Sequence, residues 1–321
     1  MGTCIRNLSD SAVLVAADDT WIEGKAIQQL ETTARLAGMH RVAGMPDLHP
    51  GRGYPVGAAF FSVGRFYPAL VGNDIGCGMA LWRTDIPTAK LHLDKLEKRL
   101  GNLDLPLDES WQEAVAGFEL PTTGHERSLG TIGGGNHFAE LQQLDESYDD
   151  AALAALNIER KHLLLLVHSG SRGLGEAILR EQVDLFGHQG LEAGSDASSH
   201  YLSRHDGALR FAEANRQLIA RRMLERLRAD GERLLDINHN LVSPARVDGF
   251  DGWLHRKGAT PSDQGAVVIP GSRGDYSYLV QPIADERSLL SLAHGAGRKW
   301  MRSECNCLLY TSDAADDTPC V

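Results

Sequence analysis

The chain has 321 residues, and its 32 lysines and arginines against 43 aspartates and glutamates give a formal net charge of −11. This composition is typical of globular proteins and excludes a disordered or fibrous chain. The negative charge argues against a nucleic-acid-binding protein that is basic over its whole surface, but it does not exclude a local basic groove. No apolar run approaches the roughly 18 residues that cross a bilayer. We therefore expect a soluble, cytoplasmic protein without a membrane partner.

The hydrophobic pattern predicts strands and helices in mixed order. The predicted strands are 12–17, 58–63, 79–84, 162–168, 266–269 and 276–281. The predicted helices are 21–37, 89–100 and 208–230, and each of them ends at a glycine. Because these elements do not alternate strictly as βαβ units, the sequence favours the α+β class. The segment 190–203, rich in Gly, Ser, Ala and Asp, predicts an exposed loop.

The segment 305–321 differs from the rest of the chain. It contains no lysine or arginine, shows no periodicity and holds three of the five cysteines. Cysteines spread this unevenly do not indicate a disulfide framework in a chain of this size. We expect this tail to be disordered or foreign to a domain that spans residues 1–304.

The first motif whose side chains could bind a metal is Asp74-Ile-Gly-Cys77. A carboxylate three residues before a thiol, with glycines around it, lets both side chains turn toward one point. A thiolate together with a carboxylate suits a borderline divalent metal. In the alternative interpretation, Cys77 is a small buried hydrophobic residue and Asp74 a turn residue.

The second motif is Gly133-Gly-Gly-Asn136-His137-Phe-Ala-Glu140. Its glycines allow the backbone to approach a phosphate or a neighbouring strand closely. If a helix begins here, His137 and Glu140 project from the same side of it. The alternative is a tight turn before a helix, without a ligand.

The third motif begins in the buried strand 162–168 and continues as His168-Ser-Gly-Ser-Arg172. Such a loop offers backbone N–H groups, hydroxyls and a guanidinium to an anion. His168 stands at the end of the strand, where a metal ligand or a base is expected. The alternative is a core histidine with a satisfied hydrogen bond.

Four further motifs follow along the chain. They are Asn238-His239-Asn240, His255-Arg256-Lys257, Pro270-Gly271-Ser272 and His294-Gly-Ala-Gly-Arg298. Together with the first three, they predict a metal-assisted enzyme that acts on phosphates. A histidine in such a site can attack an α-phosphate and displace pyrophosphate, but the residues alone do not say which histidine does so. The arginines of the long helix, Arg216, Arg221 and Arg222, are candidates for a local basic groove, although a solvated helix face is the favoured interpretation.

These motifs, in this order, resemble the RtcB family of GTP-dependent RNA ligases over about residues 40–304. The resemblance implies an α+β domain with mixed sheets, flanking helices and an active site in a central cleft. It also implies an enzyme of RNA repair or tRNA splicing that joins an RNA 3′-phosphate or 2′,3′-cyclic phosphate to a 5′-hydroxyl end. The implied cofactors are GTP and two manganese(II) ions, and an archease-type activator is an implied partner.

The resemblance also implies roles for individual residues. Cys77 resembles the thiolate that bridges two manganese ions, and His294 resembles the histidine that becomes guanylylated. The other implied metal ligands are Asp74, His137, His168 and His239. The implied nucleotide contacts are Asn136, Glu140, His239, Asn240, Pro270, Gly271, Ser272, His294, Gly295, Ala296, Gly297 and Arg298. The implied RNA and phosphate contacts are His49, Arg172, Arg256 and Lys257.

The sequence departs from the family pattern near its C-terminal end. Family members continue past the His-Gly-Ala-Gly-Arg motif to a lysine that contacts the nucleotide, whereas no lysine follows Lys299 here. We expect a truncated chain of a compact, bacterial-type branch. Two rival functions stay open, namely a metal-dependent phosphodiesterase that opens cyclic phosphates and an inactive protein that binds RNA ends.

Overall fold

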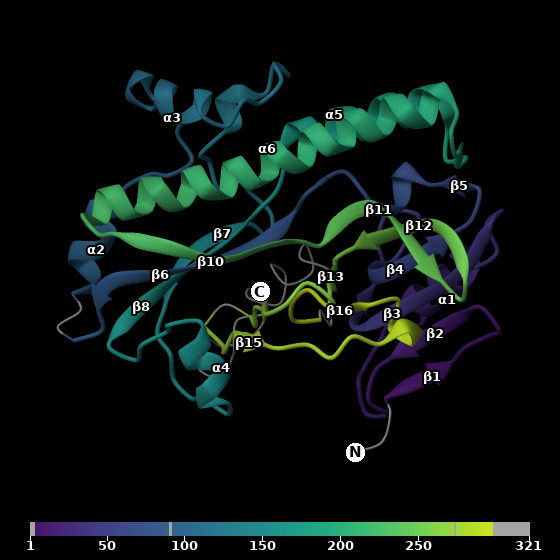
Figure 1. Ribbon diagram of the computed structural model, residues 1–321, viewed down its shortest axis with the longest axis horizontal. Helices are drawn as coiled ribbons and strands as arrows, with labels where there is room; N and C mark the ends of the chain where they lie inside the picture. Colours follow the sequence, from purple (N-terminus) through teal and green to yellow (C-terminus); the bar gives the residue numbers. More distant parts are fainter. Residues whose placement is uncertain (1–3, 90–91, 273, 298–321) are drawn as a thin grey trace, which may run out of the picture. The chain divides into compact units, whose positions relative to one another are not determined.

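The computed structural model describes residues 4–89, 92–272 and 274–297, so the predicted tail lies outside the described residues. The chain forms two compact units, unit 1 (Met1–Phe66 with Val242–Val321) and unit 2 (Tyr67–Leu241). Helices and strands are mixed, which confirms the α+β interpretation (Figure 1). The bounds 1–304 of one domain and its central cleft stay predictions. Within the described ranges, no helix combines the length and apolar character needed to span a membrane.

Unit 1 contains a six-stranded sheet. Its strands, in spatial order, are β1 (Ile5–Asn7), β2 (Ala12–Val15), β3 (Met39–His49), β4 (Val56–Ser62), β12 (Phe250–Lys257) and β11 (Asn240–Val247). Strands β2 and β3 pair in parallel, which requires a crossover, and helix α1 (Gly24–Thr33) supplies it. The smaller elements of unit 1 are β5 (Arg65–Phe66), η4 (Glu286–Ser288) and two antiparallel strand pairs. These pairs are β13 (Ala259–Pro261) with β16 (Ser291–Ala293), and β14 (Val267–Ile269) with β15 (Tyr278–Val280).

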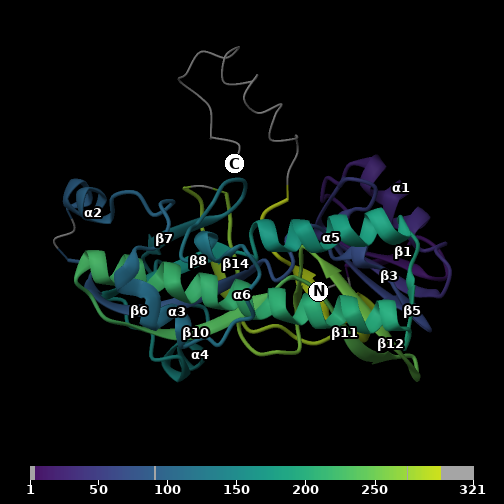
Figure 2. The same cartoon turned by 90° about the horizontal axis from the view of Figure 1, so that it is seen from above.

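Unit 2 is built on a four-stranded antiparallel sheet. Its spatial order is β10 (Gly231–Asn238), β6 (Gly78–Pro87), β8 (His162–Ser169) and β7 (Phe138–Gln142). The long helix α6 (Asp196–Leu227) packs on this sheet, and α5 (Gly173–Phe186) lies beside α6 (Figures 1 and 2). The shorter elements of unit 2 are η1 (Pro68–Leu70), α2 (Leu93–Leu100), η2 (Glu109–Trp111), α3 (Gln112–Ala116), η3 (Glu126–Ser128), α4 (Asp150–Ala155) and β9 (Leu191–Glu192).

The core of unit 2 lies between its sheet and α6. Trp82 from β6, Leu165 from β8 and Met223 from α6 belong to one buried cluster. Such burial of apolar side chains is the main stabilising contribution to packing, at roughly 25 cal/mol for each Å² removed from water. The helix is therefore fixed on one face of the sheet, with its buried polar residues held against the same strands.

The strand register in unit 2 brings four strand ends to one edge. Gly78, at the start of β6, pairs with Asn238 at the end of β10 and with Ser169 at the end of β8. Phe138, at the start of β7, pairs with His168. Because neighbouring strands run in opposite directions, two strand starts and two strand ends meet there. The residues that flank these pairs in sequence are thereby gathered at a single edge.

Two predictions about local structure were wrong. Residues 196–203 of the predicted loop form the start of α6, which Ser195 caps by accepting a hydrogen bond from the Ser198 N–H at 3.2 Å. A serine and an aspartate at a helix start are good capping residues, so their polarity marks the helix terminus here rather than a loop. The stretch after His137 is also no helix, because residues 138–142 form β7 against β8.

The interpretation of the helix arginines as a solvated face was also wrong for two of them. Arg216 and Arg222 are buried, with 0% and 5% exposed, whereas Arg221 is exposed. Both buried guanidinium groups make hydrogen bonds inside unit 2. A buried charge requires such partners, since an unpaired one costs several kcal/mol.

Candidate active site

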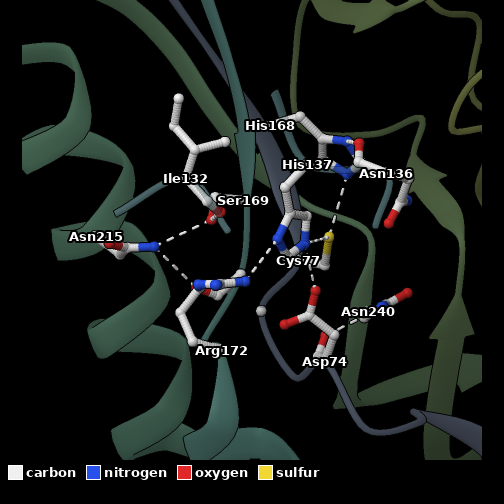
Figure 3. A network of polar contacts seen from close by, with 12 residues as sticks. Asp74, Cys77, Ile132, Asn136, His137, His168, Ser169, Arg172, Asn215 and Asn240 are labelled. Carbon is white, nitrogen blue, oxygen red and sulfur yellow. Dashed lines mark hydrogen bonds and ion pairs between the residues drawn. The ribbon is translucent and has the colours of Figure 1, made fainter. Parts of the chain in front are cut away.

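Five side chains at the common strand edge of unit 2 form two groups of three that share Cys77 (Figure 3). One group is Cys77, His168 and His239, and the other is Asp74, Cys77 and His137. In each group the candidate ligand atoms all lie within 4.8 Å of one another. The structure therefore brings together all five residues that the sequence predicts as metal ligands, with the thiol in the shared position.

The distances around the Cys77 sulfur are short. Its Sγ lies 3.1 Å from Nε2 of His168 and 3.5 Å from Nε2 of His137. Nε2 of His168 is in turn 3.4 Å from Nε2 of His239. Sulfur and imidazole nitrogen atoms that converge in this way offer their lone pairs to a common point, as metal ligands do.

Neighbouring groups orient two of these ligands. Nδ1 of His168 lies 2.8 Å from the carbonyl oxygen of Asn136. Nδ1 therefore carries the proton, and the lone pair of the neutral ring lies on Nε2, which faces Cys77. Asn240 donates from its Nδ2 to the carbonyl oxygen of Asp74 at 3.0 Å. Two residues predicted to touch the nucleotide thus contact the ligand set itself.

His137 has a different environment. Its Nε2 lies 2.7 Å from Oδ2 of Asp74, and its Nδ1 lies 3.0 Å from Nη1 of Arg172 (Figure 3). A guanidinium only donates hydrogen bonds, so Nδ1 is the acceptor and Nε2 carries the proton toward Asp74. The proton must leave Nε2 before this nitrogen can bind a cation.

Burial and charge shift the pKa values of two ligands in opposite directions. Burial and the Asp74 charge raise the pKa of the Cys77 thiol well above its usual range. Burial by itself raises the pKa of Asp74, but the hydrogen bond and charge of His137 outweigh it and lower the pKa. The second oxygen of Asp74, Oδ1, is buried and accepts no hydrogen bond from any described residue. A carboxylate, a thiol and imidazoles with an unsatisfied oxygen fit a borderline divalent cation.

His294 follows strand β16 in unit 1 and is held by a buried carboxylate. Its Nδ1 lies 2.7 Å from Oδ2 of Asp47, and its backbone N–H donates to the same oxygen at 3.1 Å. Asp47 belongs to β3 and is only 2% exposed. A buried carboxylate this close to the ring stabilises positive charge on the imidazole. Nε2, the other ring nitrogen, is the candidate nucleophile.

Gly258 makes room for the His294 ring. Its φ is +60°, and a Cβ at this position would lie 2.8 Å from Cε1 of His294. A side chain here would be strained and would also collide with the ring. The glycine that ends the His255-Arg256-Lys257 motif is therefore a requirement of the site.

The two predicted nucleotide segments of unit 1 lie side by side. The backbone N–H of Ala296 donates to the carbonyl oxygen of Pro270 at 3.0 Å. A Cβ on Gly295 would lie 3.6 Å from the same oxygen. Pro270 is thus in contact with the segment that directly follows His294. Arg298 lies outside the described residues.

Two predicted RNA contacts make interactions within the chain. Arg256 is buried and donates to Oγ of Ser291 at 2.9 Å, and burial lowers its pKa to about 10. Lys257 lies with its Nζ 6.0 Å from the centre of the Tyr54 ring, and burial lowers its pKa to about 8. Their contacts with RNA stay predictions.

Two further predicted residues, Glu140 in unit 2 and His49 in unit 1, make contacts within their own units. Glu140, in β7, accepts a hydrogen bond from Nε2 of Gln142 at 2.7 Å. His49 places its Nδ1 2.8 Å from the carbonyl oxygen of Asp47. The sequence analysis missed Asp47 itself. Its signal was an acidic residue in an apolar run, since the segment 42–48 contains Asp47 among residues that are mostly buried.

The chain is similar to known proteins of one family. The family model described as "tRNA-splicing ligase RtcB" matches residues 29–112 and 112–318. The chain is 59% identical to RNA-splicing ligase RtcB2 of Escherichia coli strain ATCC 25922, over 95% of this chain and 80% of that protein. It is 31% identical to tRNA-splicing ligase RtcB of Nanoarchaeum equitans (92% and 80%) and 29% identical to RNA-splicing ligase RtcB of Escherichia coli K12 (91% and 82%). The chain belongs to the RtcB family.

Proposed function

We propose that this protein is an RNA ligase that uses GTP and manganese(II) to join an RNA 3′-phosphate to a 5′-hydroxyl end. One observation carries the proposal, namely the contact of 2.7 Å between Asp47 and Nδ1 of His294. This contact leaves Nε2 as the nucleophilic nitrogen, as a histidine that accepts a nucleotide requires. The names of the relatives and the paired ligand groups around Cys77 support the same reaction.

In the proposed first step, Nε2 of His294 attacks the α-phosphorus of GTP. An N–P bond forms, the P–O bond to the β-phosphate breaks, and pyrophosphate leaves. The imidazole gains positive charge in this step, and the buried carboxylate of Asp47 stabilises that charge through the Nδ1 proton. Pro270–Ser272 and Gly295–Gly297 would hold the nucleotide beside His294, since Ala296 and Pro270 are hydrogen-bonded to each other.

The proposed metal ligands are the five residues at the edge of the unit 2 sheet. Cys77, His168 and His239 would hold one manganese ion, and Asp74, Cys77 and His137 would hold a second. When bound, such ions supply positive charge to phosphate oxygens and orient the reacting groups. The buried, unsatisfied Oδ1 of Asp74 supports this assignment.

In the proposed second and third steps, the guanylyl group activates the RNA. An oxygen of the RNA 3′-phosphate attacks the phosphorus on His294, and the N–P bond breaks. The 5′-hydroxyl of the second RNA then attacks the 3′-phosphate, its proton is lost, and GMP leaves. A 2′,3′-cyclic phosphate must first be hydrolysed by water. Arg172 and Lys257 are the proposed contacts for RNA phosphates, and Nε of Arg172 is buried without a hydrogen-bond partner among the described residues.

Selection of guanine is assigned to Glu140. Its carboxylate can accept two N–H groups from the edge of guanine, an arrangement that adenine does not offer. In the ligand-free protein this carboxylate accepts from Gln142 instead. Guanine would therefore replace Gln142 as the donor.

The proposal is tested with two short RNAs, one ending in a 3′-phosphate and one beginning with a 5′-hydroxyl. We expect a joined product only when both GTP and manganese(II) are present, and no product from His294→Ala. The exposed His200, changed to Gln, is the matched control and should leave joining unchanged. Opening of a cyclic phosphate without GTP and without joining would instead support a phosphodiesterase. RNA binding without either reaction would support an RNA-end binder.

A further inference from the structure

Arg216 of α6 is the largest fully buried side chain among the described residues, with 0% of it exposed. Its guanidinium donates four hydrogen bonds within unit 2. Nε donates to Oδ1 of Asp236 (2.7 Å), Nη1 donates to the carbonyl oxygens of Gly76 (2.6 Å) and Ser169 (2.9 Å), and Nη2 donates to Oδ1 of Asn238 (2.7 Å). The acceptors come from β10, from the end of β8 and from the loop before β6.

Three of these acceptors are sequence neighbours of candidate metal ligands. Gly76 directly precedes Cys77, and Asn238 directly precedes His239. Ser169 directly follows His168. One rigid side chain thus contacts the residues next to all three members of the group Cys77, His168 and His239.

We propose that Arg216 is a positioning residue that sets the spacing of Cys77, His168 and His239. This inference rests on the proposed metal centre, although it does not depend on the ligase reaction. The planar guanidinium carries five donors in a fixed fork, so it holds its acceptors at set distances from one another. Groups that orient metal ligands by hydrogen bonds, without touching the metal themselves, typically contribute about tenfold to a hundredfold in metal affinity.

The charge of Arg216 is balanced inside unit 2. The carboxylate of Asp236, whose side chain is 7% exposed, faces the guanidinium. A buried ion pair alone adds little stability compared with apolar packing, because both charges lose their water. Its use here is geometric, since an apolar side chain at this position makes none of the four hydrogen bonds.

Arg222 provides a matched control on the same helix. It is also buried, and its Nη1 donates to the carbonyl oxygens of Leu103 (3.1 Å), Leu105 (3.0 Å) and Gly130 (2.6 Å). None of these three residues is next to a candidate ligand in the sequence. A change at Arg222 therefore removes comparable buried hydrogen bonds without touching the ligand neighbours.

The test compares Arg216→Lys with Arg222→Lys and the wild-type protein in titrations with cobalt(II). Cobalt(II) reports on the site because a bound thiolate gives a charge-transfer absorption band. A lysine keeps the positive charge opposite Asp236. Its one nitrogen cannot replace the two separate nitrogens, Nη1 and Nη2, that donate to Gly76, Ser169 and Asn238. We expect Arg216→Lys to weaken cobalt affinity about tenfold or more and to change the thiolate band. Arg222→Lys should lower the melting temperature by about as much as Arg216→Lys does. It should leave the cobalt affinity and the thiolate charge-transfer band unchanged.

Two results would overturn the inference. If Arg216→Lys binds cobalt with wild-type affinity and band, Arg216 has a purely structural role. If the wild-type protein shows no thiolate band, the metal centre itself fails, and the role of Arg216 fails with it. Should Arg216→Lys not fold, Asn238→Ala decides the matter, since it removes the acceptor beside His239 together with the Nδ2 donor to Glu213 and leaves Arg216 in place. Weaker cobalt binding by this variant supports the inference, and unchanged binding contradicts it.

Discussion

Nδ1 of His294 lies 2.7 Å from Oδ2 of Asp47, and that same oxygen accepts the backbone N–H of His294. One buried carboxylate oxygen therefore fixes both the ring and the backbone of the proposed nucleophile. Gly258 leaves space for the ring, since a Cβ there would lie 2.8 Å from it. These contacts lie within unit 1 and place a buried negative charge beside the His294 ring.

Asp47→Asn should slow the formation of the GMP adduct. The change removes the negative charge next to Nδ1, and a hydrogen bond to a charged group is worth about 1.5–3 kcal/mol. That energy corresponds to a rate loss of about tenfold to a hundredfold. The measurement is the rate of adduct formation at saturating GTP. The exposed Asp251, changed to Asn, is the control in the same unit. Equal rates for the wild type and Asp47→Asn would contradict the role of Asp47.

The shared position of Cys77 predicts unequal effects on metal content. The wild-type protein should bind two manganese ions, and His239→Ala should keep only the ion on the other group of three. Cys77→Ala should lose both ions, because each group of three contains the thiol. The measurement is the metal content after equilibrium dialysis. Retention of one tightly bound ion by Cys77→Ala would show that the thiol does not bridge.

Metal binding should release a proton and weaken as the pH falls. Burial and the Asp74 charge raise the pKa of Cys77, so the ion-free site holds a neutral thiol. The metal binds the thiolate, and affinity should therefore fall by about tenfold for each pH unit and each proton released. Calorimetric titrations in two buffers with different ionisation heats measure the proton count. Identical heats in both buffers would exclude proton release.

Arg172 should oppose metal binding at the group that contains His137. Its guanidinium donates to Nδ1 of His137, which keeps the proton on Nε2, the nitrogen that faces Asp74 and Cys77. Arg172→Met removes that donor, and a hydrogen bond of about 0.5–1.5 kcal/mol corresponds to a gain of about twofold to tenfold in affinity. The exposed Arg180 of α5, changed to Met, is the control for lost charge. An unchanged or lower affinity in Arg172→Met would contradict this competition.

Local motifs next to strand ends indicated Asp74, Cys77 and His168 as candidate metal ligands, whereas the full set of five came from the resemblance to the RtcB family. Cys77 and His168 flank apolar runs that form β6 and β8, and their chemistry is readable from residue type and position. What the motifs do not contain is the register that places Gly78 opposite both Asn238 and Ser169. That register depends on long-range pairing, which no local pattern encodes.

The residues that the sequence analysis missed or misread act at long range. Asp47 and His294 are 247 positions apart, and Arg216 reaches Gly76 across 140 positions. Arg216 stands on the same helix as the exposed Arg221, so composition alone favours a solvated interpretation for both. The polar start of α6 was misread because serine and aspartate are common both in loops and in helix caps.

The central claim is that His294 is the residue that accepts GMP from GTP. Its most direct test is peptide mass spectrometry of the protein after incubation with GTP and manganese(II). The account predicts a mass increase of one GMP on the peptide that contains His294, absent from His294→Ala and retained in His200→Gln. A GMP adduct on another residue, or an adduct that persists in His294→Ala, would contradict the account.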